Sequence, residues 1–247
     1  MAGTARIIAR PPPAPLRVAH RWLLAARARF LLGGVVVHGD PRRREIALTF
    51  DDGPSAEHTP VVLALLGEHK VPATFFMLGR HVSEHPEIAR AVAAGHEIGF
   101  HSQDHERGSV ASLAAFREDL GRCRAVIERE LNVVPRLYRF PWGDHGAVTA
   151  REVFALAGLT CIHWSGSIKE SLGALQMAKR LGRHLIPGAI LLLHDGLAPN
   201  SAHRGPRTEM LSALPLILDE IASRGLEPVT VSRLLRLDPA PPRQRPP

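Results

Sequence analysis

The sequence predicts an α/β fold in which parallel strands alternate with helices. Short β-like runs and helical stretches follow one another from Ile46 onward, and several helical stretches end at a glycine. With 247 residues, 45% of them hydrophobic and 22% charged, the chain is long enough for one sizeable core. This alternation is typical of either a barrel or an open parallel sheet.

The expected strands are short apolar runs rich in β-branched and aromatic residues. They cover residues 46–50, 73–78, 97–102, 137–142, 159–165, 189–194 and 228–231. The expected helices between them have apolar residues at helical spacing. They cover residues 60–69, 83–94, 112–131, 147–157, 170–185 and 208–224.

The two ends of the chain differ in composition from this central part. We expect residues 1–42 to form a partly helical extension, residues 43–236 a catalytic domain, and residues 237–247 a disordered Pro/Arg-rich tail. The apolar run at 22–26 is interrupted by Arg27 and Arg29 before it reaches the length of a signal peptide core or a membrane span. A cytoplasmic protein is therefore favoured, with an exported or cell-envelope protein as the alternative. Membrane association through the N-terminal segment is a less favoured alternative.

Charge and cysteine content exclude some classes of partner and site. The net charge is +7, but the arginines are scattered and not interleaved with aromatic residues, so no nucleic-acid partner is expected. The two cysteines, Cys123 and Cys161, fall on apolar positions and are expected in the core. Because no Cys-x-x-Cys spacing exists, any metal site must use histidines and carboxylates.

Residues able to do chemistry gather where the expected strands end. In parallel α/β folds the carboxyl ends of the strands form one edge, where catalytic residues collect. The groups are Asp51 and Asp52 after the first strand, His101 and His105 after the third, residues 139–143 after the fourth, residues 164–167 after the fifth, and residues 194–196 after the sixth. Their shared position favours an active site over a set of ordinary turns.

The residue types fit a metal hydrolase. His101 and His105 are four residues apart, so both imidazoles can reach one ion, and two histidines with one carboxylate form a known catalytic zinc set. One of the two adjacent aspartates could then bind the metal while the other takes a proton from water. The spacing alone does not say which does which. His194, at the end of an apolar strand, is either a core residue or a general acid.

Four ordered motifs resemble those of the polysaccharide deacetylase family, which shares the chitooligosaccharide deacetylase homology domain. They are T-F-D-D-G-P at 49–54, H-S-Q-D-H at 101–105, R-F-P-W-G at 139–143 and L-L-H-D-G at 192–196. The resemblance extends from about Glu45 to Leu235. It implies a distorted (β/α) barrel of about seven parallel strands and metal-dependent removal of acetyl groups from N-acetylated sugars of a polysaccharide or oligosaccharide.

The resemblance also implies roles by position. Asp52, His101 and His105 would bind a divalent metal, most often zinc. Asp51 would be the base and Arg139 would hold it ionised. The metal and the backbone N–H of Trp142 would stabilise the oxyanion, and His194 would protonate the departing amine.

One stretch departs from the family pattern. Relatives usually carry an aspartate after the fifth strand that orients the catalytic histidine, whereas this chain reads H-W-S-G-S-I-K-E-S, with Ser167 and Glu170 nearby. Either Glu170 replaces that aspartate, or His194 acts without such support, or the enzyme is slow or takes another acyl group. Two alternatives therefore stay open: a non-catalytic glycan-binding relative, and a metal hydrolase of another amide or an O-acetyl ester.

Overall fold

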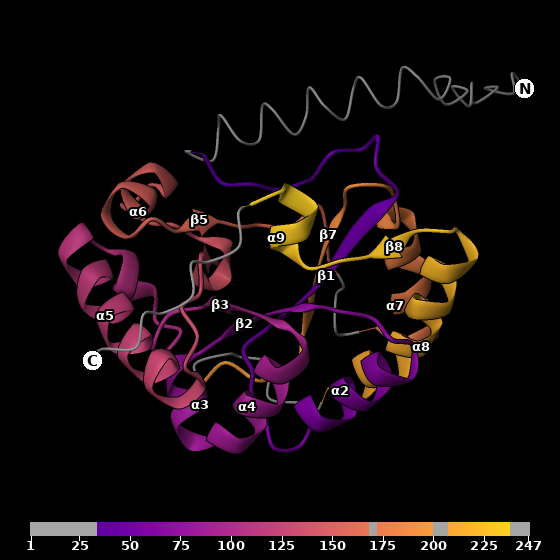
Figure 1. Cartoon of the computed structure of the whole chain (residues 1–247), viewed down its shortest axis with the longest axis horizontal. Coiled ribbons are helices and arrows are strands. Elements are labelled where there is room, and N and C mark those ends of the chain that lie inside the picture. The colour runs from indigo at the N-terminus through magenta and orange to yellow at the C-terminus, as the bar shows by residue number, and fades with distance from the viewer. Residues whose placement is uncertain (1–33, 168–171, 200–206, 238–247) are drawn as a thin grey trace, which may run out of the picture.

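A curled sheet of parallel strands forms the centre of the protein, and helices surround it (Figure 1). This computed structural model describes residues 34–167, 172–199 and 207–237. The strands are β1 (Glu45–Asp51), β2 (Thr74–Met77), β3 (Glu97–Phe100), β4 (Leu137–Tyr138), β5 (Thr160–Cys161), β6 (Gly166–Ser167), β7 (Ile190–His194) and β8 (Glu227–Pro228). They lie in the order β5-β4-β3-β2-β1-β7-β6, and β8 pairs with the start of β1.

The helices fill the connections between the strands. They are α2 (Thr59–Glu68), α3 (Gly79–Glu84), α4 (Pro86–Gly95), α5 (Leu113–Leu131), α6 (Ala150–Ala157), α7 (Ala174–Leu181), α8 (Thr208–Ser223) and α9 (Val231–Leu235). Short 3₁₀ turns occupy Arg107–Val110, Pro141–Gly143 and Gly182–His184. None of the helices in the described ranges is long and apolar enough to cross a membrane.

Strand β1 is central, and its residues are buried along its whole length. A strand covered on both faces needs apolar residues at successive positions, which explains the run Ile46-Ala47-Leu48. β2 pairs with one side of β1 and β7 with the other, so that Asp51 lies level with Phe76 and His194. Asp51 and His194, which were expected at the ends of two separate strands, are therefore neighbours.

The sheet curls into a distorted barrel, as predicted. Its edge strands β5 and β6 are consecutive along the chain, and the segment before β1 forms bridges with the residue after β5 and with the residue before β7. Val36 forms a bridge with Ile162, and His38 forms a bridge with Ala189. The predicted fold class is confirmed, and the observed sheet includes the expected strands in short or full form.

Some element boundaries were predicted wrongly. The expected helix 83–94 is two helices, α3 and α4, because Pro86 lacks an N–H and begins a new helix after His85. The expected strand 137–142 keeps only Leu137–Tyr138, since the chain turns at Pro141. The expected strand 159–165 is reduced to Thr160–Cys161, followed by β6. Thr230 caps an unexpected helix, α9, by accepting a hydrogen bond from the Arg233 N–H.

Other expectations fall partly outside the described ranges. Residues 1–33 of the expected extension and 238–247 of the expected tail lie outside them, as do residues 170–171 of an expected helix. Cys123 and Cys161 are both buried free thiols, in agreement with their expected place in the core.

Candidate metal centre and active site

Six of the predicted site residues line one hollow at the carboxyl ends of the strands. This hollow has a volume of about 230 Å³, and its lining includes Asp51, Asp52, His101, His105, Trp142 and His194. Arg139 lies directly behind Asp51 and is fully buried. Groups far apart in the sequence thus form one compact site, and the expected grouping at the strand ends is observed.

Asp52, His101 and His105 form a cluster that can hold a metal ion. Their ligand atoms all lie within 4.8 Å of one another, and the three side chains are buried. Asp52 Oδ1 is 3.5 Å from His101 Nε2 and 3.4 Å from His105 Nε2. Bonds of about 2.0–2.2 Å to a tetrahedral zinc ion require ligand separations of about 3.3–3.6 Å. The two measured separations fit such an ion.

The chemistry of the donors also fits a divalent cation. His101 Nδ1 lies 2.9 Å from the Arg139 carbonyl oxygen, so this nitrogen carries the proton and Nε2 keeps its lone pair. Asp52 Oδ1 is buried and has no hydrogen-bond partner among the described residues. A buried carboxylate oxygen without a partner is costly unless a cation or a donor satisfies it.

The pKa directions agree with a site that attracts positive charge. Burial would raise the pKa of Asp52, but the imidazoles of His101, His194 and His105 lower it well below its ordinary value. Burial would lower the pKa of His101, but the carboxylates of Asp51 and Asp52 raise it. The Asp51 and Asp52 carboxylates therefore favour a positive charge between the clustered side chains. Either a proton on His101 or a bound divalent cation can supply that charge.

A carboxylate on α5 holds the loop that carries both histidines. Ser102 Oγ donates a hydrogen bond to Asp119 Oδ1 at 3.0 Å, and the Gln103 N–H donates to the same oxygen at 3.1 Å. The His105 N–H in turn donates to Ser102 Oγ at 3.1 Å. Asp119 is a positioning residue that the sequence reading missed. A signal existed, because Asp119 lies on the same helix face as Phe116 and Cys123.

Asp51 is held by a buried arginine. Arg139 Nη1 donates to Asp51 Oδ1 at 2.7 Å and contacts Thr49 Oγ1 at 2.7 Å. Arg139 Nη2 donates to the His163 carbonyl at 3.1 Å, and the guanidinium lies 4.0 Å from the centre of the Phe76 ring. Burial lowers the pKa of Arg139, while the Asp51 charge opposes that shift. The pair leaves Asp51 Oδ2 facing the metal cluster, 3.7 Å from His101 Nε2.

His194 and its neighbour Asp195 point into different surroundings. His194 lines the hollow, whereas Asp195 is fully buried and accepts a hydrogen bond of 2.6 Å from Thr59 Oγ1. Burial raises the pKa of Asp195 to about 7, although the Thr59 hydrogen bond lowers it. Successive residues of a strand face opposite sides, so Asp195 does not take the place of the missing aspartate.

Left-handed backbone conformations are concentrated in this site. Four of the non-glycine residues with positive φ are Asp52 (71°), Ser102 (80°), His105 (59°) and Trp142 (61°). Such conformations are uncommon outside glycine and gather at functional sites. The Trp142 ring lies 4.8 Å from that of His105, so this residue forms one wall of the site.

The stretch after the fifth strand that departs from the family pattern is described in the structure as far as Ser167. Ser167 is exposed and lies level with Leu192 on β7, two residues before His194. Ser167 does not line the hollow around His194. Glu170 lies outside the described residues, so its suggested role stays a prediction.

Arg207 was not singled out from the sequence, yet it lines the hollow. It is buried, its Nη2 lies 3.8 Å from Asp52 Oδ2, and its Nε donates to the Gly196 carbonyl at 2.8 Å. Burial lowers the pKa of Arg207, while the Asp52 charge opposes that shift. Arg207 thus connects Asp52 with the segment that follows His194.

Comparisons with known proteins agree with this site. The sequence model of the polysaccharide deacetylase family matches residues 38–162. A chitooligosaccharide deacetylase of Bradyrhizobium sp. is 35% identical over 195 residues, which cover 74% of this chain and 87% of that protein. A peptidoglycan-N-acetylglucosamine deacetylase of Bacillus cereus is 36% identical over 199 residues, which cover 77% of this chain and 88% of that protein.

Solved structures support the fold. The crystal structure of the Bc1960 peptidoglycan N-acetylglucosamine deacetylase superposes with a TM-score of 0.76 at 24% identity, covering 85% of this chain and 97% of that one. A CE4 family pseudoenzyme from Bacillus anthracis superposes with a TM-score of 0.71 at 25% identity, covering 82% of this chain and 69% of that one.

These findings bear on two further predictions. A hydrolase acting on carbon–nitrogen bonds other than peptide bonds is confirmed, because the named relatives are N-deacetylases. The expected cytoplasmic location has no support, since peptidoglycan lies outside the cytoplasm, and the exported alternative is compatible with these relatives. From its family match, its relatives and its fold, the chain belongs to the polysaccharide deacetylase family.

Proposed function

We propose that this chain is a metal-dependent N-deacetylase that removes acetyl groups from N-acetylglucosamine units of peptidoglycan or chitooligosaccharides. These are the substrates named for its relatives. The observation that carries the proposal is the buried Asp51–Arg139 pair, placed directly beside the cluster of Asp52, His101 and His105. A binding module has no chemical need for a base held in this way.

Asp52, His101 and His105 would hold the metal, and zinc fits their mixed nitrogen and oxygen donors. When bound there, a divalent metal would lower the pKa of a water molecule and polarise the acetyl carbonyl. The distances from Asp52 Oδ1 to the two histidines support this role for the cluster.

Asp51 acts as the general base in this mechanism. Its Oδ2 takes a proton from the attacking water as the water oxygen bonds to the acetyl carbon. Arg139 binds the other carboxylate oxygen, so Asp51 stays oriented toward the metal cluster while it works. The buried guanidinium also supplies the countercharge that an interior carboxylate requires.

His194 acts as the general acid. It lies level with Asp51 on the neighbouring strand and on the wall of the same hollow. It donates a proton to the amide nitrogen as the bond between that nitrogen and the acetyl carbon breaks. The products are acetate and a sugar with a free amine.

The walls of the hollow suit a small acetamido group. Trp142, Trp164, Leu192 and Ala198 line it beside the polar groups. These apolar side chains can receive the acetyl methyl group, and the Trp142 backbone N–H is proposed to donate to the developing oxyanion. Since peptidoglycan lies outside the cytoplasm, the proposed substrate places the enzyme in the cell envelope or outside the cell.

A substrate panel tests the proposal. Chelator-stripped protein, with and without added zinc, is given N-acetylglucosamine oligomers, peptidoglycan fragments and an O-acetylated xylan, and acetate is measured. We expect zinc-dependent release from N-acetylated substrates, and none from Asp51→Asn. Release from the O-acetyl ester alone would favour an esterase. Binding of the oligomers without any acetate release would favour a non-catalytic glycan-binding protein. A structurally similar protein is a pseudoenzyme of the CE4 family.

A further inference from the structure

The net positive charge of the protein resides in the two ends of the chain. Residues 1–33 contain six arginines and no acidic residue, and residues 238–247 contain two arginines and one aspartate. Subtracting these contributions of +6 and +1 from the total of +7 leaves residues 34–237 with no net charge. The basic character is therefore a property of two short segments.

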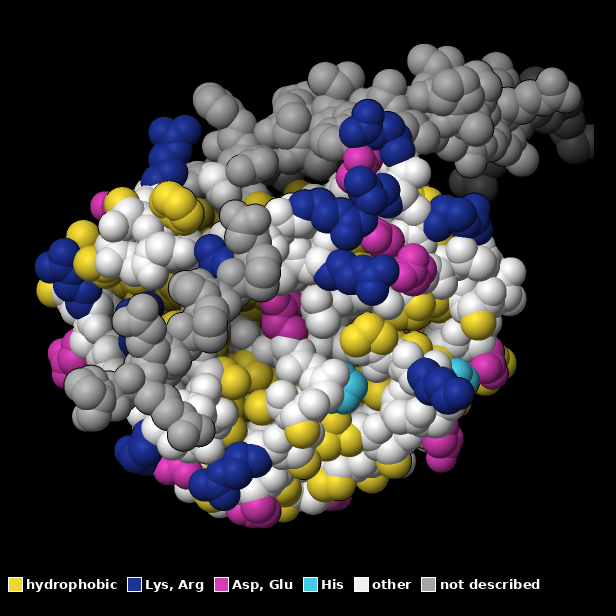
Figure 2. Space-filling model, viewed as in Figure 1, with side chains coloured by type: hydrophobic (Ala, Val, Ile, Leu, Met, Phe, Trp, Pro, Cys, Tyr) yellow, Lys and Arg dark blue, Asp and Glu magenta, His cyan; other side chains and the backbone are white. Residues whose placement is uncertain are grey.

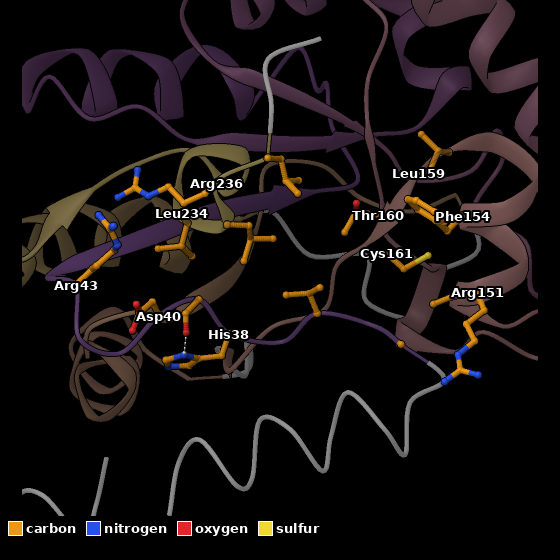
Figure 3. A pocket seen from close by; sticks show the side chains of 16 residues that line it. His38, Asp40, Arg43, Arg151, Phe154, Leu159, Thr160, Cys161, Leu234 and Arg236 are labelled. Carbon is orange, nitrogen blue, oxygen red and sulfur yellow. Dashed lines mark hydrogen bonds between the residues drawn. The ribbon is translucent and has the colours of Figure 1, made fainter. Parts of the chain in front are cut away.

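Both basic segments join the folded domain at the same groove. Gly34 and Leu237, the first and last described residues, line a groove with a volume of about 910 Å³ (Figure 3). Its wall includes Phe154, Leu159 and Leu234, which are apolar. Phe154 is 61% exposed, so its ring presents apolar surface to the solvent.

Arginines surround this apolar surface. Arg43 and Arg236 lie toward one end of the groove, and Arg151 lies toward the other (Figure 3). Arg236 pairs with Glu45, whereas Arg43 and Arg151 form no ion pair with any other described residue. Figure 2 shows further Lys and Arg side chains near α9, on the part of the surface where the chain enters β1. Arg42, Arg44 and Arg233 are also exposed; Arg42 pairs with Asp40, which lines the groove, and Arg233 pairs with Glu227.

The groove lies at the opposite end of the barrel from the active site. Arg43 precedes β1, and Asp51 ends it, so the full length of the strand separates them. A strand of seven residues spans about 20 Å. A partner bound at the groove would therefore leave the catalytic hollow open.

Two occupants of the groove can be compared by their charge: the preceding segment of the chain and an anionic lipid surface. The chain's own preceding segment has apolar residues, but its Arg27 and Arg29 carry the same charge as the groove arginines and would be repelled by them. An anionic lipid surface attracts the groove arginines and both basic ends together, and it also accepts exposed apolar side chains such as Phe154. We propose that this face docks on an anionic phospholipid membrane, with the active site directed away from it.

Vesicle co-sedimentation of the full chain tests the docking. The vesicles are phosphatidylcholine with phosphatidylglycerol, compared with phosphatidylcholine alone. We expect binding only to the anionic vesicles. Because each surface arginine contributes about fivefold to such binding, Arg43→Gln with Arg151→Gln should weaken it about 25-fold. Phe154→Ser should weaken it further.

A charge-matched control separates docking from general attraction. Arg117→Gln with Arg180→Gln removes two exposed charges from α5 and α7, which do not line the groove. This control should bind vesicles like the unaltered protein. Equal weakening in the control, or unchanged binding in the groove variants, would overturn the proposal, as would a lack of binding to anionic vesicles. The assay uses no glycan, so its outcome is independent of the proposed deacetylase activity.

Discussion

Asp51→Asn tests the division of labour between the two adjacent aspartates. The substitution keeps the shape of the side chain, and its Oδ1 can still accept the 2.7 Å hydrogen bond from Arg139. It removes the basic carboxylate at Oδ2, which lies 3.7 Å from His101 Nε2. We therefore expect the fold and the metal cluster to persist while proton transfer fails.

The expected magnitudes follow from these contacts. Loss of a general base lowers kcat by about 10²–10⁴-fold, equivalent to about 2.7–5.4 kcal/mol in the activation barrier. Arg139 loses its countercharge but keeps its contacts with Thr49 and the His163 carbonyl. The free energy of unfolding should therefore fall by less than the about 3–5 kcal/mol that breaking a buried ion pair costs. Zinc affinity should fall by no more than about 10–100-fold, the range for groups outside the ligand set.

Three measurements on the same protein check this reasoning. Acetate release gives kcat, urea unfolding gives stability, and competition with a chromogenic chelator gives zinc affinity. Asp52→Asn is the matched control, since it has the same change of charge at a proposed ligand and should lose zinc as well as activity. Retained turnover in Asp51→Asn, or equal loss of zinc in the two variants, would refute the assigned roles.

Three further outcomes are expected. Arg207→Met removes the charge that lies 3.8 Å from Asp52 Oδ2 and the hydrogen bond to the Gly196 carbonyl. The free energy of unfolding of the metal-free protein should therefore fall by about 1–3 kcal/mol. The zinc-loaded protein should lose less stability, because zinc also neutralises Asp52. Equal losses with and without zinc in urea unfolding would contradict this. Burial and the Arg139 charge lower the pKa of His163 to about 4 in the folded protein. In the unfolded chain the His163 imidazole binds a proton below about pH 6.5, whereas in the folded protein it does so only near pH 4. Stability should thus fall by about 3 kcal/mol between pH 6.5 and 4 through this residue, and His163→Gln should lack that part of the fall; an identical pH dependence in the variant would exclude the explanation. If Glu170 orients His194, Glu170→Gln should lower kcat about tenfold or more, and an unchanged pH–rate profile would remove Glu170 from the mechanism.

Most of the site was predictable because its residues lie in short segments with a fixed relation to the strands. Asp51 ends a strand whose burial requires its apolar run, Asp52 follows it, and parallel pairing then places His194 level with Asp51. His101 and His105 share one loop, so their spacing alone brings them together. The carboxyl ends of the other strands supply the remaining members.

The residues that were missed act across long separations in the sequence. Arg207 reaches Asp52 from the start of α8, and nothing in the local sequence distinguishes it from the other scattered arginines. Asp119 was detectable in principle, because a charged residue on the buried face of a helix requires polar partners. The break at Pro86 was also readable, since proline favours the first position of a helix.

The short strands were harder to predict from local pattern. β4 ends after Tyr138 because the following residues turn at Pro141, where Trp142 adopts a positive φ that no residue preference indicates. The apolar residues at 140–142 are compatible with a strand or with a buried turn, so their periodicity alone does not distinguish the two. This turn shapes the wall of the active site rather than the sheet.

A zinc titration of acetate release tests the central claim most directly. Chelator-stripped protein is mixed with an N-acetylglucosamine oligomer, and acetate is measured as zinc is added stepwise. Because Asp52, His101 and His105 form one cluster, we predict that release rises until one zinc ion is bound per chain and stops when chelator is restored. Full release by the metal-free protein, or no release by protein shown to hold zinc at this cluster, would contradict the account.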